Sequence, residues 1–158
     1  MIYETERDRQ EEARIMRAVA KRLGGSLDFV KMPPKDPFDF AVIEPKTSDI
    51  MGYVEVKRRS HAHGRYRQYM ISQSKYFRAR DVLAYTGRPT FLLVSFVDAI
   101  LITCLSDLRP AQFSLRMGGR TDRDDPNDLD PCIFFDISLF QLVELPTYNG
   151  GMDVIESN

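Results

Sequence analysis

The chain has 158 residues, a formal net charge of −1, and 43% hydrophobic and 28% charged residues. This is the composition of an ordinary globular domain, which excludes a low-complexity chain and is long enough to bury a core without disulfide bonds. The near-zero charge excludes overall basicity as a source of affinity for a polyanion, so such affinity requires a local basic patch.

The cysteines and the N-terminal region indicate the compartment. Cys104 and Cys132 lie in apolar runs with no His or Cys at metal-ligand spacing, which predicts buried free thiols in a reducing environment. The N-terminal region is charged and helical in pattern, and no stretch is long and apolar enough to span a membrane. We therefore expect a cytoplasmic protein with no membrane partner and no organic cofactor.

The first predicted element is a helix from Thr5 to Leu23. Thr5 and Asp8 have the spacing of a capping box, and Gly24-Gly25 is a stop signal. Its apolar stripe consists of Ile15, Met16, Val19 and Leu23. Glu12 falls within this stripe, where a carboxylate is costly unless it is paired or binds a metal. The alternative is that Glu12 lies at the edge of the stripe and reaches water.

Three strands are expected next, at Ser26–Met32, Asp39–Ile43 and Gly52–Lys57. β-branched and aromatic residues cluster in them. The last two are separated by the turn formers Pro45, Thr47, Ser48 and Asp49, which predicts a hairpin.

The side chains of this hairpin indicate its chemistry. Glu55 and Lys57 alternate with Val54 and Val56, so the carboxylate and the ammonium share one face, next to Asp39 on the neighbouring strand. Two carboxylates hold a hard divalent cation, which acidifies a water and neutralises charge on a phosphate. An ammonium beside them orients the nucleophile or stabilises charge. The pattern indicates metal-assisted phosphodiester hydrolysis, and the alternative is a surface ion pair.

Asp39 followed by Glu55-Val56-Lys57 resembles the motif of the PD-(D/E)XK nuclease superfamily, with Pro37 one residue earlier than in the usual Pro-Asp. The resemblance implies an α/β fold with a mixed central β-sheet flanked by helices, the restriction-endonuclease-like core. It also implies that Asp39, Glu55 and the carbonyl of Val56 bind Mg²⁺ or Mn²⁺ and that Lys57 is the catalytic lysine.

The resemblance covers roughly residues 4 to 105. Two branches of the superfamily imply roles for two further residues. In nucleases of the Holliday-junction resolvase and RecB-like branches, an acidic residue of the first helix joins the metal site. Glu12 matches by position, and Glu11 is the alternative. RecB-like nucleases also carry Gln-x-x-x-Tyr on the helix after the Glu-x-Lys strand; Gln73 matches the glutamine, but Phe77 stands at the tyrosine position.

The segment from Val56 to Arg80 carries eight basic residues and no acidic one. This segregation predicts a cationic surface beside the proposed metal site, where phosphates would be neutralised. The expected substrate contacts are Gln73, Lys75, Arg58, Arg59 and Arg65. Tyrosines at positions 66, 69 and 76 are interleaved with these residues, and packing is favoured over stacking on bases.

A helix is predicted from Tyr66 to Tyr85, ended by glycine and proline. Gln73 would lie within its apolar face, where an amide needs hydrogen-bond partners. Lys75 would project elsewhere and contact phosphate rather than take part in the chemistry. His61 and His63 have a spacing that can bind zinc, but no further ligand is nearby, so we favour a loop that contacts DNA or solvent.

The C-terminal part predicts strands at Pro89–Val97, Ala99–Leu105, Gln112–Arg116 and Cys132–Ile137, and a helical turn at Ser138–Val143. Met117–Pro131, rich in Asp, Gly and Pro, is expected to be irregular and fails the EF-hand pattern. It is either a surface loop or a flap in which Arg120 and Arg123 reach the substrate. We take residues 1–145 as one nuclease domain and 146–158 as a loosely ordered tail.

Together these patterns predict a Mg²⁺- or Mn²⁺-dependent deoxyribonuclease, an endonuclease rather than an exonuclease, acting on DNA that includes branched or otherwise structured forms. Its small size suggests a homodimer, or action within a larger complex, and suits a phage-encoded or a repair and recombination enzyme. The alternative is a non-catalytic nucleic-acid-binding module of the same fold, which would use the basic patch alone. A structural or assembly protein is disfavoured, because it leaves the basic segment unexplained.

Overall fold

The computed structural model describes residues 5–22, 25–119 and 126–145. Its helices are α1 (Glu6–Arg22) and α2 (Gln73–Thr86). Its strands are β1 (Asp28–Lys31), β2 (Phe40–Ile43), β3 (Ile50–Arg58), β4 (Gln68–Ser72), β5 (Thr90–Ser95), β6 (Ile100–Cys104), β7 (Phe113–Gly119), β8 (Leu129–Asp136) and β9 (Gln141–Glu144).

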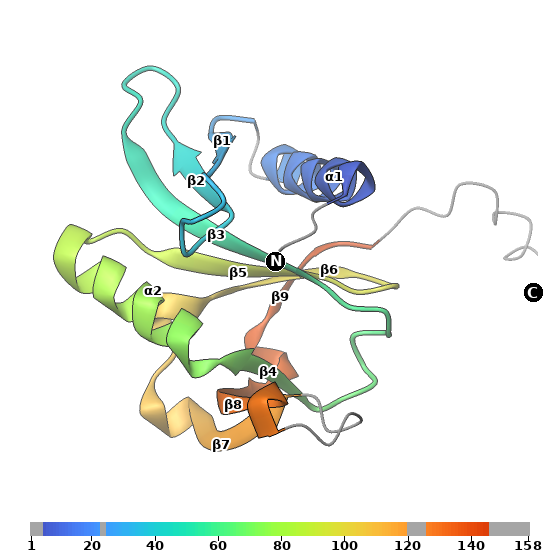
Figure 1. Cartoon of the computed structure of the whole chain (residues 1–158). Coiled ribbons are helices and arrows are strands. Elements are labelled where there is room, and N and C mark those ends of the chain that lie inside the picture. The colour runs from blue at the N-terminus through green and yellow to red at the C-terminus, as the bar shows by residue number, and fades with distance from the viewer. Residues whose placement is uncertain (1–4, 23–24, 120–125, 146–158) are drawn as a thin grey trace, which may run out of the picture.

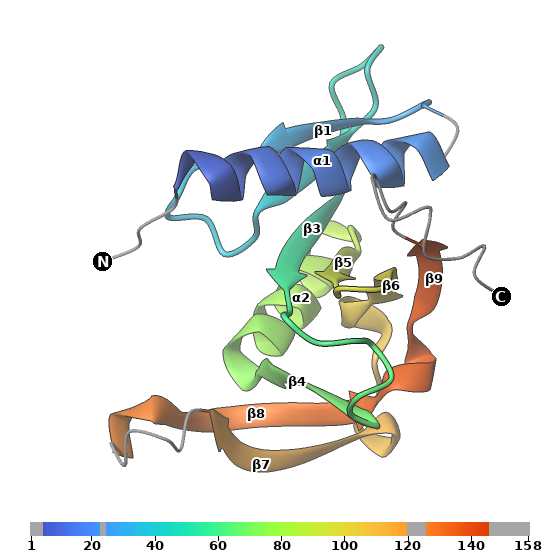
Figure 2. The same ribbon diagram turned by 90° about the vertical axis from the view of Figure 1, so that its right-hand side faces the viewer.

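The strands of the described residues form two sheets. The larger is a mixed sheet of six strands in the order β1-β2-β3-β5-β6-β9, and the smaller has three strands in the order β4-β8-β7. Helix α1 covers one face of the large sheet, while α2 and the small sheet lie on its other face (Figures 1 and 2). The predicted α/β architecture is confirmed, but the separate small sheet was not foreseen.

Helix α1 begins as the sequence predicts. The main-chain N–H and the hydroxyl of Thr5 donate to Asp8 Oδ2 at 3.0 and 2.7 Å, and the Asp8 N–H donates to Thr5 Oγ1 at 3.1 Å, which closes a capping box. The apolar stripe packs on the large sheet through Ile15, Met16 and Val19, which are buried. Leu23, the expected end of this stripe, lies outside the described residues.

The predicted hairpin is confirmed. Strands β2 and β3 pair antiparallel with Phe40 opposite Val54, and β3 pairs in parallel with β5 on its other side. Gly52 allows this second pairing, because a Cβ there would lie 2.9 Å from the carbonyl oxygen of Pro89. Strand β3 is therefore held on both sides in the middle of the large sheet.

The prediction of a helix from Tyr66 was wrong in its first part. Residues Gln68–Ser72 form β4, which pairs antiparallel with β8, and α2 begins only at Gln73. Tyr69 and Ile71 are buried while the residues on either side of them are more exposed, the alternation of a strand. The partner strand lies far along the chain, so this tertiary pairing overrides the local pattern. The predicted end of the helix, at Gly87 with φ 71°, is confirmed.

The expectation of an irregular segment over Met117–Pro131 was wrong at both ends. Strands β7 and β8 extend into it, with Met117 opposite Pro131 and Gly119 opposite Leu129. Gly119 has φ 127°, and a Cβ there would lie 2.1 Å from the carbonyl oxygen of Asp128, so only glycine fits. The proposed flap residues Arg120 and Arg123 lie outside the described residues.

The C-terminal turn was also only partly right. Ile137–Leu139 is a 3-10 turn, but the strand β9 follows it and pairs antiparallel with β6 at the edge of the large sheet. Residues 146–158, the expected tail, lie outside the described residues. Cys104 and Cys132 are free thiols; Cys132 is buried and Cys104 is partly exposed. Neither described helix combines the length and apolar character that a membrane crossing needs.

Candidate functional site

Asp39 lies just before β2, at the point where β3 continues past the end of its antiparallel neighbour. The Asp39 N–H donates to the carbonyl of Val54 at 3.0 Å, and Asp39 Oδ2 accepts from the N–H of Val56 at 2.8 Å. The N–H and C=O of one strand residue point to the same side of the strand. The carbonyl of Val56 therefore also faces the Asp39 side of β3.

Glu55 is buried, with 2% of its surface exposed. Val54 and Val56 pack toward α1, and Glu55 points to the opposite face of the sheet. There the ammonium of Lys57 lies 3.3 Å from Glu55 Oε1 and that of Lys75 lies 3.2 Å from Oε2. The prediction that Glu55 and Lys57 share a face is confirmed, and each carboxylate oxygen has one cationic neighbour.

The sequence suggested that Lys75 projects away from this group, but this was wrong. It lies in the first turn of α2, donates to the carbonyl of Pro37 as well as to Glu55, and lies 5.9 Å from the centroid of the Phe38 ring. It thus joins α2 to the segment that leads into Asp39. No signal in the sequence indicated this, because the helix was expected to begin at Tyr66, which would have placed Lys75 in its middle.

Opposing electrostatic effects act on the Glu55 carboxylate. Burial raises the pKa of Glu55 above its ordinary value, and the negative charge of Asp39 adds to this effect, while Lys57 and Lys75 act in the opposite direction. The two carboxylates therefore repel each other across the hairpin. A hard divalent cation with oxygen ligands would remove this repulsion, so Asp39, Glu55 and the carbonyl of Val56 fit such an ion.

Glu12 lies on the wall of a neighbouring cavity. Its carboxylate is 2.6 Å from the ammonium of Lys31 on β1. This ion pair offsets the cost of placing a carboxylate within the apolar stripe of α1. With Asp39 it lines a cavity of about 270 Å³, whose other acidic residues, Asp8 and Asp36, sequence reasoning missed. Within the described ranges no three or more Asp, Glu, His or Cys residues form a cluster that could hold a metal. In the described residues Asp39 and Glu55 therefore form a pair and not a larger acidic cluster.

Glu11, the alternative to Glu12, has a different partner. Its carboxylate Oε1 lies 2.7 Å from Nη2 of Arg14 on the same helix. It is not among the residues that line the cavity beside Asp39. Of the two acidic residues, Glu12 is the one on the Asp39 side.

The predicted substrate contacts are dispersed. Arg58 lies 2.9 Å from the Asp8 carboxylate, Arg59 lies 5.3 Å over the Tyr69 ring, and Arg65 Nε donates to the hydroxyl of Tyr66 at 3.2 Å. Gln73, the first residue of α2, lines a different small cavity with Ser72, Ser74, Asp130 and Pro131. Among the described residues the partners of Glu55 are lysines, so the structure does not bring Gln73 to the carboxylate pair.

The two histidines are held separately. The N–H of His63 donates to Asp98 Oδ1 at 2.9 Å, and its Nδ1 lies 2.8 Å from Asp98 Oδ2. Nδ1 of His61 lies 2.9 Å from the carbonyl of Ala62. Each ring therefore uses its Nδ1 in a protein contact, and the two rings have different partners. Of the tyrosines, Tyr69 and Tyr76 are buried as expected, but Tyr66 is 53% exposed.

The family follows from a comparison with protein-family models. Residues 1–143 match the model described as "Phage putative PDDEXK endonuclease". The chain belongs to this family. The match extends from α1 into β9, well beyond the part that the motifs cover, and it confirms the PD-(D/E)XK superfamily and its α/β fold. As a member, the chain is a nuclease of the PDDEXK type.

Among solved structures, the chain is similar to Hjc, a Holliday junction resolvase from the archaeal hyperthermophile Archaeoglobus fulgidus. The identity is 10%, the TM-score is 0.45, and the similarity covers 78% of this chain and 88% of that chain. No curated protein sequence matches the chain. The PDDEXK motif has one lysine, which corresponds to Lys57, whereas here a second lysine, Lys75, reaches the same glutamate from α2.

Proposed function

We propose that the chain is a divalent-metal-dependent endonuclease that hydrolyses DNA phosphodiester bonds, with Mg²⁺ or Mn²⁺ as cofactor. The observation that carries this proposal is the buried Glu55, which has Asp39 on the neighbouring strand and an ammonium at each of its oxygens. A buried carboxylate next to a second carboxylate is unfavourable for folding, and such arrangements are common at functional sites. The family match and the basic segment that follows Lys57 support a nucleic-acid substrate.

In this proposal Asp39, Glu55 and the carbonyl of Val56 hold the metal. Glu12 is the further acidic ligand, and it would leave its ion pair with Lys31 to bind the metal. A bound divalent cation supplies neutralisation of phosphate charge and a lower pKa for water.

The lysines have different parts in this mechanism. Lys57, whose side chain is 35% exposed, orients the attacking water and stabilises charge on the phosphate. Lys75 is a positioning residue, because it holds Glu55 and the carbonyl of Pro37 together. Arg58 and Arg59 extend the positive charge along β3 and its continuation, where the DNA backbone would lie.

The finer parts of the proposal concern substrate and assembly. The phage description of the family supports a phage-encoded enzyme. A single small domain has one site, and cleavage of both strands of a duplex calls for two, so we propose a homodimer. Branched or otherwise structured DNA is the proposed preferred substrate.

The test is cleavage of supercoiled plasmid and of a synthetic four-way junction with Mg²⁺, Mn²⁺ or EDTA. We expect metal-dependent cutting that falls at least about a hundredfold in Asp39→Asn and in Lys57→Met, the scale of losing one electrostatic contact in a transition state. Lys46→Met, at an exposed position in the β2–β3 turn, is the charge-matched control and should cut normally. Salt-sensitive binding without cutting in any metal would leave only the binding module.

A further inference from the structure

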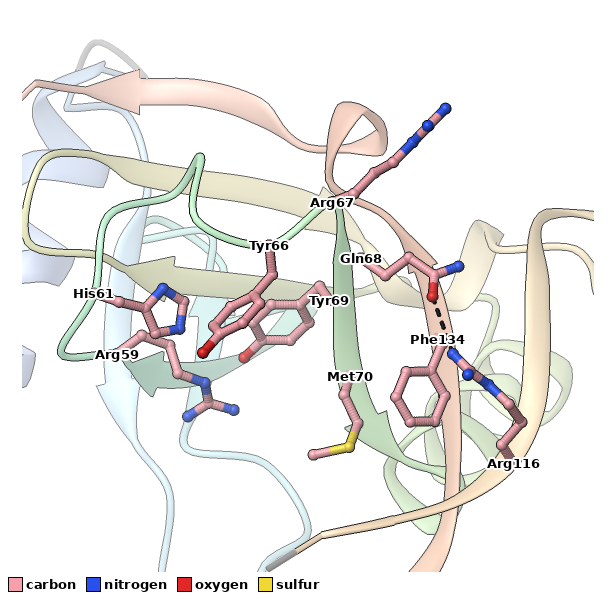
Figure 3. Close-up of a pocket in the computed structure, with 9 residues that line it drawn as sticks. All are labelled: Arg59, His61, Tyr66, Arg67, Gln68, Tyr69, Met70, Arg116 and Phe134. Atoms are coloured by element: carbon pink, nitrogen blue, oxygen red, sulfur yellow. Dashed lines mark hydrogen bonds between the residues drawn. The ribbon is translucent and has the colours of Figure 1, made fainter.

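A second cavity, of about 540 Å³, lies at the open edge of the small sheet (Figure 3). It is lined by the segment that connects β3 to β4, by β4 itself, and by side chains of β7 and β8. Figure 3 shows Arg59, Tyr66 and Tyr69 on one side of β4 and Phe134 and Arg116 on the other. The metal site described above does not use this cavity.

The lining combines positive charge with flat aromatic surfaces. The guanidinium carbon of Arg116 lies 4.0 Å from the centroid of the Phe134 ring, and its Nη2 donates to Gln68 Oε1 at 3.0 Å. The guanidinium carbon of Arg59 lies 5.3 Å from the centroid of the Tyr69 ring. None of the described residues that line the cavity is acidic. Such a lining is complementary to a ligand with both a negative charge and an aromatic ring.

One polar group in the cavity lacks a partner. The hydroxyl of Tyr69 is buried and has no hydrogen-bond partner among the described residues. Burial raises the pKa of Tyr69 to about 12, so the hydroxyl keeps its proton and stays a donor. Buried polar groups are nearly always paired, and because this hydroxyl is closed to solvent, a ligand in the cavity would pair with it only after the side chains that cover it move.

The cavity begins close to the proposed metal site along the chain, because Arg59 lines it. Arg59 follows Lys57 by two residues, about 7 Å along an extended chain, which corresponds to one or two nucleotides of a DNA strand. A DNA strand whose phosphate lies at Lys57 therefore reaches this cavity.

We propose that the cavity binds an unpaired nucleotide of the DNA substrate next to the cleaved phosphate. Its base stacks on Tyr66, a residue that is 53% exposed, and accepts a hydrogen bond from Tyr69, while Arg59 and Arg116 contact the phosphates. A paired base inside a duplex cannot make these contacts. The inference rests on the proposed function, because the ligand belongs to the same DNA, and it specifies a substrate with a single-stranded segment at the site.

The experiment measures binding in EDTA, where no cleavage occurs. The probes are a DNA duplex and the same duplex with a single-stranded flap that carries 2-aminopurine at its first unpaired position. We expect the wild type to bind the flap duplex roughly tenfold more tightly and to quench the 2-aminopurine, the scale of stacking one base. Tyr66→Ala and Arg116→Ala should lose this preference. Arg88→Ala, an exposed arginine that does not line the cavity, should keep it.

A second variant separates ligand binding from folding. Tyr69→Phe removes only the hydroxyl without a partner, so its melting temperature should equal or exceed that of the wild type while its flap preference falls. Equal binding of both probes by the wild type, or a preference that survives in Tyr66→Ala, would overturn the inference. A flap preference without plasmid cleavage would refute the catalytic proposal alone, and cleavage without a flap preference would refute the nucleotide site alone.

Discussion

Replacement of Lys75 by methionine tests the central feature of the site. The change keeps most of the side-chain volume and removes the ammonium that contacts Glu55 and the carbonyl of Pro37. A hydrogen bond with a charged partner contributes about 1.5–3 kcal/mol. Lys57 still lies 3.3 Å from Glu55, and 29% of the Lys75 side chain is exposed. The two contacts of Lys75, with Glu55 and with Pro37, therefore contribute less than two fully buried ones would. We expect a loss of about 2 kcal/mol in the free energy of unfolding.

The assay is thermal unfolding followed by circular dichroism in EDTA. For a chain of 158 residues, a loss of about 2 kcal/mol lowers the melting temperature by about 4–8 °C. Arg78→Met is the matched control, because it removes a cation from an exposed position of the same helix. Its free energy of unfolding should change by less than about 0.5 kcal/mol.

The cleavage rate provides an independent readout. Lys75→Met should cut more slowly but retain measurable activity, since Glu55 keeps Lys57 and Asp39 keeps its bond to the N–H of Val56. If Lys75→Met had the same melting temperature as the wild type, the reasoning would be refuted, because the ammonium would then contribute nothing at Glu55. An equal drop in Arg78→Met would refute it as well, since general charge would then explain the effect.

Two further predictions concern the carboxylates. The pKa of Glu55 is raised above its ordinary value of 4.5, so above pH 4.5 the unfolded chain loses a proton that the folded protein still holds. The free energy of unfolding therefore falls as the pH rises through the raised pKa. Glu55→Gln should therefore melt above the wild type in EDTA by a margin that grows from acid to neutral pH; a constant margin would contradict this. Mn²⁺ should raise the wild-type melting temperature, since a ligand at a hundred times its Kd stabilises by about 2.7 kcal/mol. Calorimetric titration and unfolding should show this effect lost in Asp39→Asn and kept in Lys46→Met.

Much of the core of the site is determined by the sequence alone, because local rules govern it. The capping box of Thr5 and Asp8 sets the start of α1, and turn formers between two β-rich runs produce the β2–β3 hairpin. Side chains alternate along a strand, so Glu55 and Lys57 had to share a face. The family motif was recognisable for the same reason: its members are close in sequence or on paired neighbouring strands.

Other elements could not be predicted locally, because their form depends on distant partners. Gln68–Ser72 has helix-compatible spacing and becomes a strand only because β8 is available beside it. Gln141–Glu144 is a short edge strand whose pairing with β6 determines it. In both cases main-chain hydrogen bonds to a remote strand outweigh a weak local preference.

The tertiary structure alone decided which side chains surround the carboxylates. Lys75 reaches Glu55 because α2 packs on that face of the large sheet, and Glu12 meets Lys31 because α1 crosses β1. The second cavity is lined by Tyr66 from the segment before β4 and by Arg116 from β7, which lie far apart in the sequence. The physical reason is the same throughout: sequence patterns set the faces of each element, but the packing of elements determines which faces meet.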